Sequence, residues 1–226
     1  TIAAHFEAVH RRHGVGIQLG VSAMRIAAGA DGRAVVHASD GTAYPADIVV
    51  AAIGGVANDQ IARDAGLDCD GGILIDARGL TSDERIVAAG DCAVMRPAAG
   101  ARALRVESVG NAIEQAKAAA ATLCGGEYAA DPLAWFWSDQ FDLKLQTVGI
   151  PDRTAAEIVV GDLAADRFAV CYVRDGRLVA VDAVNLPECL IEAKRLIRSS
   201  EPFDETNMRN VAAGAAARAP ATGSGR

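Results

Sequence analysis

The apolar positions of this chain follow a helical period at its start and then change to short strand-like runs. Ile2, Phe6 and Val9 recur at the spacing of one helix face, and Gly14 is typical of the residue just after a helix end. Three strand-like runs and two turns come next: 15–19, 24–28, a turn at 31–32, 34–38 and a turn at 40–41. The pattern predicts one helix, one strand and a small antiparallel meander.

A continuously apolar run at 48–53 is typical of a strand that is covered on both faces, and it leads directly into Gly54 and Gly55. Glycines at the end of a strand allow a ligand or another backbone to come close. Asn58 is expected to cap a short helix at 59–65, and a further short strand is expected at 72–76. This alternation of strands and helices indicates an α/β fold.

Two neighbouring stretches organise the chain, TSDERIVAAGD at 81–91 and ESVGNAIEQAK at 107–117. We expect a short buried strand at 86–89, with Gly90 and Asp91 placing a carboxylate at its carboxyl end, where ligands bind in open α/β sheets. A helix that begins at Ser108 or Asn111 would bring free N–H groups and a positive dipole end to the same place. A carboxylate accepts hydrogen bonds from a sugar or polyol, and a helix start can meet an anion or an electron-rich ring edge. Together these features predict half of a cofactor site.

The composition changes after the alanine-rich helix expected at 112–123, which ends at Gly125 and Gly126. Both tryptophans of the chain, Trp135 and Trp137, follow this boundary. Four strand-like runs and a helix come next: 143–148, 156–160, 168–174, a hairpin turn at 175–176, 178–184 and a helix at 187–198. The second part is therefore predicted to be an α+β domain, and the small, polar residues from Ala212 onward are expected to be disordered.

The composition excludes several classes of protein. The 226 residues are 51% hydrophobic and 23% charged, which is ordinary for a soluble globular protein, and the net charge of −7 argues against nucleic acid or an anionic membrane as partner. We find no apolar run of the roughly 18 residues that a membrane span needs and no signal peptide, so a cytoplasmic location is expected. The five cysteines have no metal-ligand spacing, so neither a disulfide framework nor a metal site is predicted.

The two stretches that organise the chain resemble the second flavin-contact region of the FAD-dependent pyridine-nucleotide oxidoreductases. Three further strings narrow the resemblance: YPADIVVAAIGGVAND at 44–59, AGLDCDGGILIDARGLTS at 65–82 and WFWSDQFDLKLQTVG at 135–149. They are similar to ferredoxin reductases that supply electrons to ring-hydroxylating dioxygenases and haem monooxygenases. The resemblance implies a partial Rossmann-like FAD/NAD(P)-binding domain followed by a reductase C-terminal domain.

The resemblance also implies a division of the chain. Residues 1–80 would be the C-terminal part of the NAD-binding domain and residues 81–126 the returning segment of the FAD-binding domain. Residues 127–211 would form the reductase C-terminal domain, with 212–226 as a tail. The family carries two GxGxxG elements that this chain lacks, so we expect a truncated copy that binds FAD weakly by itself and is inactive alone.

Four residues would contact the flavin if the family pattern is carried over. Gly90 and Asp91 would hold a ribityl hydroxyl of FAD through the Asp91 carboxylate. Ser108 and Val109 would place a backbone contact at the pyrimidine side of the flavin, where a positive helix end stabilises negative charge on the reduced ring. Without the resemblance, a turn or helix cap would be the better interpretation of Asp91.

Further residues are implied at the edges of the site. Gly54 corresponds to the glycine edge beside NAD(H), and Trp135 and Trp137 correspond to aromatic residues at the exposed edge of the flavin, where a 2Fe–2S ferredoxin docks. Packing of the second domain on the first is an equally good interpretation of the tryptophans. Arg102 and Arg105 could steer an acidic ferredoxin.

Another basic group, at positions 194, 195 and 198 of the last predicted helix, is more typical of a solvated helix face or of a complement to the helix dipole. It carries no functional assignment of its own.

The implied reaction is hydride transfer from NADH to FAD, followed by single-electron transfer to the ferredoxin, with no catalytic base or nucleophile from this chain. The thiol–disulfide branch of the family is disfavoured because it uses a cysteine pair and a late histidine, and all four histidines here precede the flavin stretch. A rubredoxin or monodehydroascorbate reductase relative stays possible, as does a flavin-free interaction or dimerisation module. A homodimer is also compatible with the sequence. The choice between NADH and NADPH cannot be read from these residues.

Overall fold

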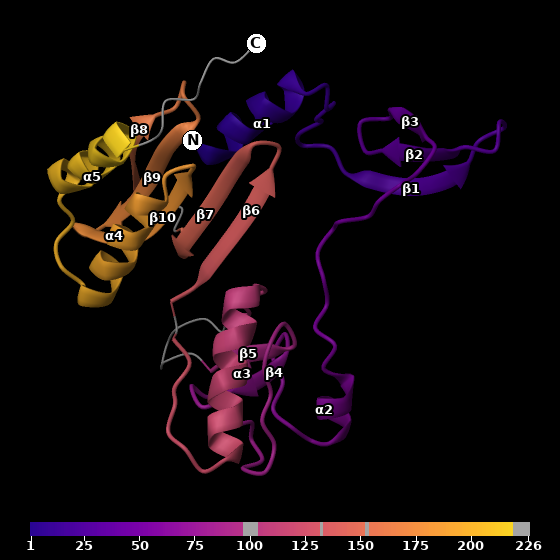
Figure 1. Ribbon diagram of the computed structural model, residues 1–226. Helices are drawn as coiled ribbons and strands as arrows, with labels where there is room; N and C mark the ends of the chain where they lie inside the picture. The colour runs from indigo at the N-terminus through magenta and orange to yellow at the C-terminus, as the bar shows by residue number, and fades with distance from the viewer. Residues whose placement is uncertain (97–103, 132, 152–153, 219–226) are drawn as a thin grey trace. The chain divides into compact units, whose positions relative to one another are not determined.

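The computed structural model describes residues 1–96, 104–131, 133–151 and 154–218 (Figure 1). These residues form two compact units, Thr1–Gly55 and Val56–Arg226. No helix within the described ranges is both long enough and apolar enough to cross a membrane.

The first unit contains the helix and the meander that the sequence predicts. Helix α1 (Ile2–Arg12) buries Phe6 and Val9, and Gly14 follows it with φ of +83°. Strands β1 (Ala23–Ala28), β2 (Ala34–Ala38) and β3 (Ala43–Ala46) form an antiparallel sheet in the order β1-β2-β3. The predictions for α1, β1 and β2 are confirmed, and β3 is an additional strand that was not predicted.

Two strand predictions in the first unit are wrong. Residues 15–19 and 48–53 are not strands, and the second run is largely in water, with Ile48, Val50 and Ile53 at 82%, 84% and 92% exposure. A strand is stable only where a neighbour receives its backbone N–H and C=O groups. No described strand pairs with either run. Apolar composition alone therefore misled the prediction.

The second unit begins with three short elements and one long helix. Helix α2 (Gln60–Asp64) has Asp59 at its N-cap rather than Asn58, and strand β4 (Ile73–Ile75) agrees with its prediction. Strand β4 pairs in parallel with β5 (Ala93–Met95), which was not predicted. Helix α3 (Val109–Leu123) lies beside this pair (Figure 1).

The predicted strand at 86–89 is wrong. These residues contribute only an isolated bridge between Leu80 and Val87, and Ile86 is exposed. The buried strand is β5 instead, where Ala93 and Val94 are inaccessible to solvent. Asp91 therefore lies just before a strand and not at the carboxyl end of one.

A five-stranded antiparallel sheet forms the rest of the second unit, in the order β6-β7-β10-β9-β8. Its strands are β6 (Trp135–Gln140), β7 (Leu143–Gly149), β8 (Ala156–Asp162), β9 (Arg167–Arg174) and β10 (Arg177–Val184). The four predicted strands and the predicted helix, α4 (Pro187–Ser199), are confirmed. Strand β6 is an addition, since the sequence analysis noted only the two tryptophans there and predicted no strand.

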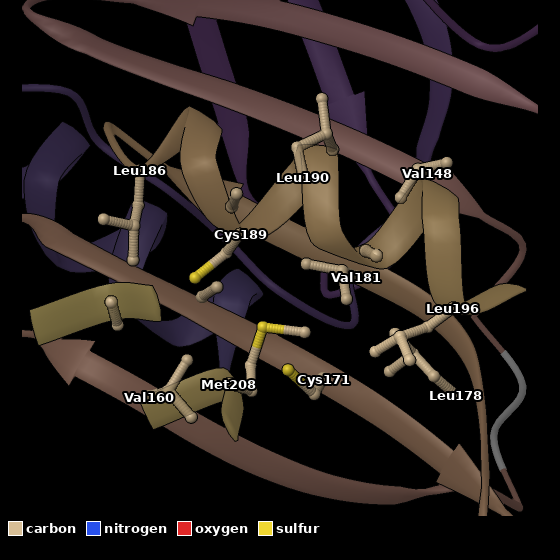
Figure 2. Close-up of a cluster of buried hydrophobic side chains, with 14 of the residues drawn as sticks. Val148, Val160, Cys171, Leu178, Val181, Leu186, Cys189, Leu190, Leu196 and Met208 are labelled. Carbon is tan, nitrogen blue, oxygen red and sulfur yellow. The ribbon is translucent and has the colours of Figure 1, made fainter. Parts of the chain in front are cut away.

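The main core lies between this sheet and the helices α4 and α5 (Glu205–Arg218), which cover one of its faces (Figure 1). Figure 2 shows Cys189 of α4 and Met208 of α5 beside Cys171 and Val181 of the sheet, and Leu186 and Leu190 belong to the same buried cluster. The expected disorder from Ala212 is wrong as far as residue 218. Ala212 and Ala215 are 4% and 3% exposed because they continue the helix face of Met208. Residues 219–226 lie outside the described part.

The two cysteines of this core provide a test of its packing. Burial raises the pKa of the Cys171 thiol to about 12 and that of Cys189 to about 11, so almost no thiolate forms at neutral pH. Cys124 follows α3 and is exposed. We expect Cys124 to react first with a thiol reagent, and Cys171 and Cys189 to react only after denaturation. Reaction of all five thiols at one rate in the folded chain would contradict this core.

Candidate functional site

An open hollow of about 580 Å³ lies where the start of α3 meets strand β6. It is lined by Asp91, Glu107, Ser108, Val109, Ala112, Phe136 and Trp137. All of these residues belong to the second unit. The hollow thus brings together four residues that the sequence singled out, from three segments of the chain: Asp91, Ser108, Val109 and Trp137.

The first turn of α3 forms one side of the hollow. Ser108 is its N-cap, because its hydroxyl oxygen accepts a hydrogen bond from the Asn111 backbone N–H at 3.2 Å. The Ser108 carbonyl accepts from the Ala112 N–H at 3.0 Å. The N–H groups of Val109 and Gly110 have no acceptor within the helix, since they belong to its first turn. This end of α3 therefore offers backbone donors and a positive dipole to a ligand.

Asp91 is held at the hollow by its backbone. Arg105 donates to the Asp91 carbonyl at 3.0 Å, and the same guanidinium is ion-paired with Glu107. These contacts tie the loop before β5 to the residues before α3. The Asp91 side chain is exposed to solvent at the hollow, where its carboxylate can accept hydrogen bonds.

Gly90 supports the site without lining it. Its φ of +83° is a left-handed conformation that favours glycine, and its N–H donates to the side-chain oxygen of Gln115 at 2.8 Å. Gln115 lies on α3 and is buried. The predicted pair Gly90-Asp91 is therefore fixed in place from α3.

The aromatic side of the hollow comes from β6. Trp137 lines the hollow, and its ring stacks on Trp135 with 4.9 Å between centroids and 29° between planes. Trp135 does not line the hollow; it packs against the main core and against Gly110 of α3. The packing interpretation thus fits Trp135, and the ligand interpretation fits Trp137.

A second hollow, of about 590 Å³, is lined by both tryptophans. Its remaining lining comes from β6, β7, the residue after β10 and the first residue of α4: Asp139, Lys144, Gln146, Asn185 and Pro187. Trp137 therefore lines both hollows, whereas Trp135 lines only the second of these two.

The basic residues suggested for docking are mostly engaged within the chain. Arg105 is occupied by Glu107 and the Asp91 carbonyl, and Arg102 lies outside the described residues. In α4, Arg195 is paired with Glu192 and Glu201, and Arg198 is paired with Asp131. These contacts favour the structural interpretation of the last helix. Steering of a partner by Arg105 stays a prediction.

Gly54, the remaining predicted site residue, belongs to the first unit. Its φ of +96° requires glycine, and a Cβ placed on it would meet no atom within 4 Å. Its backbone is therefore accessible to a ligand, and its role beside NAD(H) stays a prediction.

Comparison with known proteins identifies the family. Residues 1–121 match the family model of the pyridine nucleotide-disulphide oxidoreductases. The chain belongs to this family. Residues 135–214 match the reductase C-terminal domain, so the fold class of this oxidoreductase is confirmed as a partial dinucleotide-binding domain followed by a reductase C-terminal domain.

The relatives place this oxidoreductase in the ferredoxin reductase branch. Putidaredoxin reductase CamA of Pseudomonas putida is 40% identical over 205 residues, which are 90% of this chain and 49% of the relative. Ferredoxin–NAD(P)(+) reductase fdr of Sphingomonas sp is 38% identical over 201 residues, or 88% of this chain and 48% of the relative. The chain therefore spans about half the length of the curated relatives it matches.

Solved structures agree with this placement. The covalent putidaredoxin reductase–putidaredoxin complex has a TM-score of 0.83 at 38% identity, covering 96% of this chain and 54% of that one. A ferredoxin reductase from Rhodopseudomonas palustris has a TM-score of 0.85 at 33% identity, covering 95% of this chain and 54% of that one.

The residues of the first hollow suit one wall of a flavin site. A flat ring system needs an apolar wall, which Phe136 and Trp137 provide, and donors at its electron-rich edge, which the Val109 turn provides. Asp91 supplies an acceptor for hydroxyl groups. Sequence reasoning missed Glu107, Ala112 and Phe136. Ala112 could have been found from its i+3 spacing to Val109, and Phe136 from a strand assignment for 135–140.

Proposed function

We propose that this chain forms one wall of the FAD site of an NADH-dependent ferredoxin reductase, which passes electrons to a 2Fe–2S ferredoxin. The observation that carries the proposal is the hollow in which Asp91, Val109 and Trp137 meet, in a chain of the ferredoxin reductase branch. FAD, when bound, would supply the ability to accept a hydride and to release electrons one at a time.

Each of these residues has a distinct role in the proposal. The Asp91 carboxylate accepts a hydrogen bond from a ribityl hydroxyl. The Val109 N–H and the positive end of α3 stabilise negative charge at the pyrimidine side. Trp137 covers the ring and excludes water, which strengthens the electrostatic effect of the helix end. No side chain of this chain is required as a general base or nucleophile.

The proposed partner follows from the relatives. One solved relative is a complex of putidaredoxin reductase with putidaredoxin. The exposed edge of Trp137, beside the stacked Trp135, gives a ferredoxin a short path to the hollow. The nicotinamide dinucleotide would lie at Gly54, whose accessible backbone permits close approach.

A chimaera tests the proposal. The matching half of putidaredoxin reductase is replaced by this chain, so that the relative supplies the remaining half of the protein. We expect a yellow protein whose flavin is bleached by NADH without oxygen and which then reduces a 2Fe–2S ferredoxin. A folded but colourless chimaera would favour the flavin-free module. If the reduced flavin passes electrons only to rubredoxin or to monodehydroascorbate, the electron acceptor is that molecule and not a 2Fe–2S ferredoxin.

A further inference from the structure

A continuous stack of side chains runs from the hollow to helix α4. Trp137 lines the hollow and stacks on Trp135 at 4.9 Å. The ammonium nitrogen of Lys194, from α4, lies 4.7 Å from the centroid of the Trp135 ring, within the range of a cation–π interaction. Gly110 of α3 meets the edge of the same ring. Trp135 is thus contacted by β6, α3 and α4.

Gly110 leaves no free space beside Trp135. A Cβ on Gly110 would lie 3.0 Å from Cε3 of the Trp135 ring, which is closer than ordinary van der Waals contact. Any side chain at position 110 would therefore push the ring. A glycine within the first turn of a helix is otherwise unfavourable relative to alanine, so the close contact gives it a physical reason.

The polar atom of Trp135 does not anchor the ring. Its indole Nε1 is buried and has no hydrogen-bond partner among the described residues, although buried indole N–H groups usually find one. Packing and the cation–π contact must therefore fix where the ring lies. A ring held in this way shifts when one of its neighbours is changed.

Lys194 is suited to hold one side of the stack. Partial burial, together with the nearby charge of Arg198, lowers the pKa of Lys194, so its ammonium group is partly withdrawn from water. A desolvated cation interacts more strongly with an aromatic face. The adjacent Ala193 and the nearby Leu196 are buried in the main core, which fixes this part of α4 on the sheet.

We propose that Lys194 and Gly110 are positioning residues that act through Trp135 to set how Trp137 closes the hollow. The stack itself is a property of this chain, and only the identity of the occupant of the hollow rests on the proposed function. In this arrangement helix α4 contributes to the hollow without lining it. A substitution in α4 would then change the position of Trp137 in the wall of the hollow.

The chain contains only two tryptophans, and they are the stacked pair, so circular dichroism reports on them directly. Two indoles in such contact give an exciton couplet in the far-ultraviolet. We expect Trp137→Phe to abolish the couplet, Lys194→Met to remove at least half of its amplitude, and Lys194→Arg to restore it, since arginine keeps the cation. Arg195→Met is the matched control, because Arg195 is a cation of the same helix that is paired with Glu192 and Glu201, and it should leave the couplet unchanged.

A second variant tests the other contact. Gly110→Ala should raise the helix propensity of α3 but reduce the couplet, because the new methyl group displaces Trp135. Protection of the Cys171 and Cys189 thiols verifies that each variant is folded. A wild-type couplet in folded Lys194→Met and Gly110→Ala chains would overturn the proposal. The couplet is measured without flavin, so a chimaera that shows this pattern but stays colourless would support the stack while counting against the flavin assignment.

Discussion

Gly149→Ala is expected to destabilise the C-terminal sheet by about 3 kcal/mol or more, and to lower its unfolding midpoint by roughly 10 °C. Gly149 ends strand β7 with φ of +77°, a left-handed conformation that disfavours alanine. A Cβ there would lie 2.2 Å from the Val179 carbonyl oxygen and 2.9 Å from the Cα of Ala180. Both neighbours are backbone atoms of β10. Ala180 is paired with both β7 and β9, and Val179 lies in the irregularity just before it, so relief of the overlap requires a shift of the strand backbone.

Gly176→Ala is the matched control for this substitution. Gly176 lies in the turn between β9 and β10 with a similar φ of +71°, but a Cβ on it would meet no atom within 4 Å. Only the strain of the left-handed conformation should destabilise Gly176→Ala, by about 1–2 kcal/mol. Thermal unfolding followed by circular dichroism compares the two variants. Equal midpoints would mean that the close approach of β7 to β10 is not as tight as described.

Asp91→Ala in the chimaera is expected to weaken FAD binding by roughly 10- to 100-fold. Loss of a hydrogen bond to a charged group costs about 1.5–3 kcal/mol, and each 1.4 kcal/mol is a factor of ten in affinity. The backbone of the Asp91 loop should persist, because Arg105 contacts its carbonyl and Gln115 contacts the N–H of Gly90. The measurement is the dissociation constant of FAD, obtained by titrating the apoprotein and following flavin fluorescence.

Glu127→Ala provides the control for charge. Glu127 is exposed beyond the C-terminal end of α3, and its replacement by alanine removes the same unit of negative charge. The FAD affinity of this variant should equal that of the parent chimaera. A similar loss of FAD affinity in both variants would indicate a general charge effect and would mean that Asp91 does not contact FAD.

Local signals in the sequence were sufficient where an element depends on its own residues. Ser108 was one of the two starts predicted for α3 and is its N-cap, and the turn at Asp175-Gly176 identified the β9–β10 hairpin. The run at 48–53 misled the prediction because a strand depends on a neighbour as well as on composition. Helix α5 was missed for the opposite reason, since its alanines stabilise it only by packing on the core through Met208.

The candidate site shows the same difference between residues that local sequence can identify and residues that only the tertiary structure connects. Asp91, Ser108, Val109 and Trp137 were found because they lie in stretches with a recognisable family pattern, and the structure brings all four to one hollow. Lys194 could not be connected with that hollow from its position in the sequence, since it follows Trp135 by more than fifty residues and meets it only because β6 and α4 share one core. Such contacts require the tertiary structure.

The water-exposed run at 48–53 has a consequence for mutational tolerance. Polar substitutions at Ile48, Val50 or Ile53 remove little buried surface, so they should hardly alter the folding free energy of this chain and should increase its solubility. Apolar residues at such positions therefore do not serve the folding of the chain by itself. Substitutions in the core therefore report on the folding free energy, whereas polar substitutions at 48–53 leave it nearly unchanged.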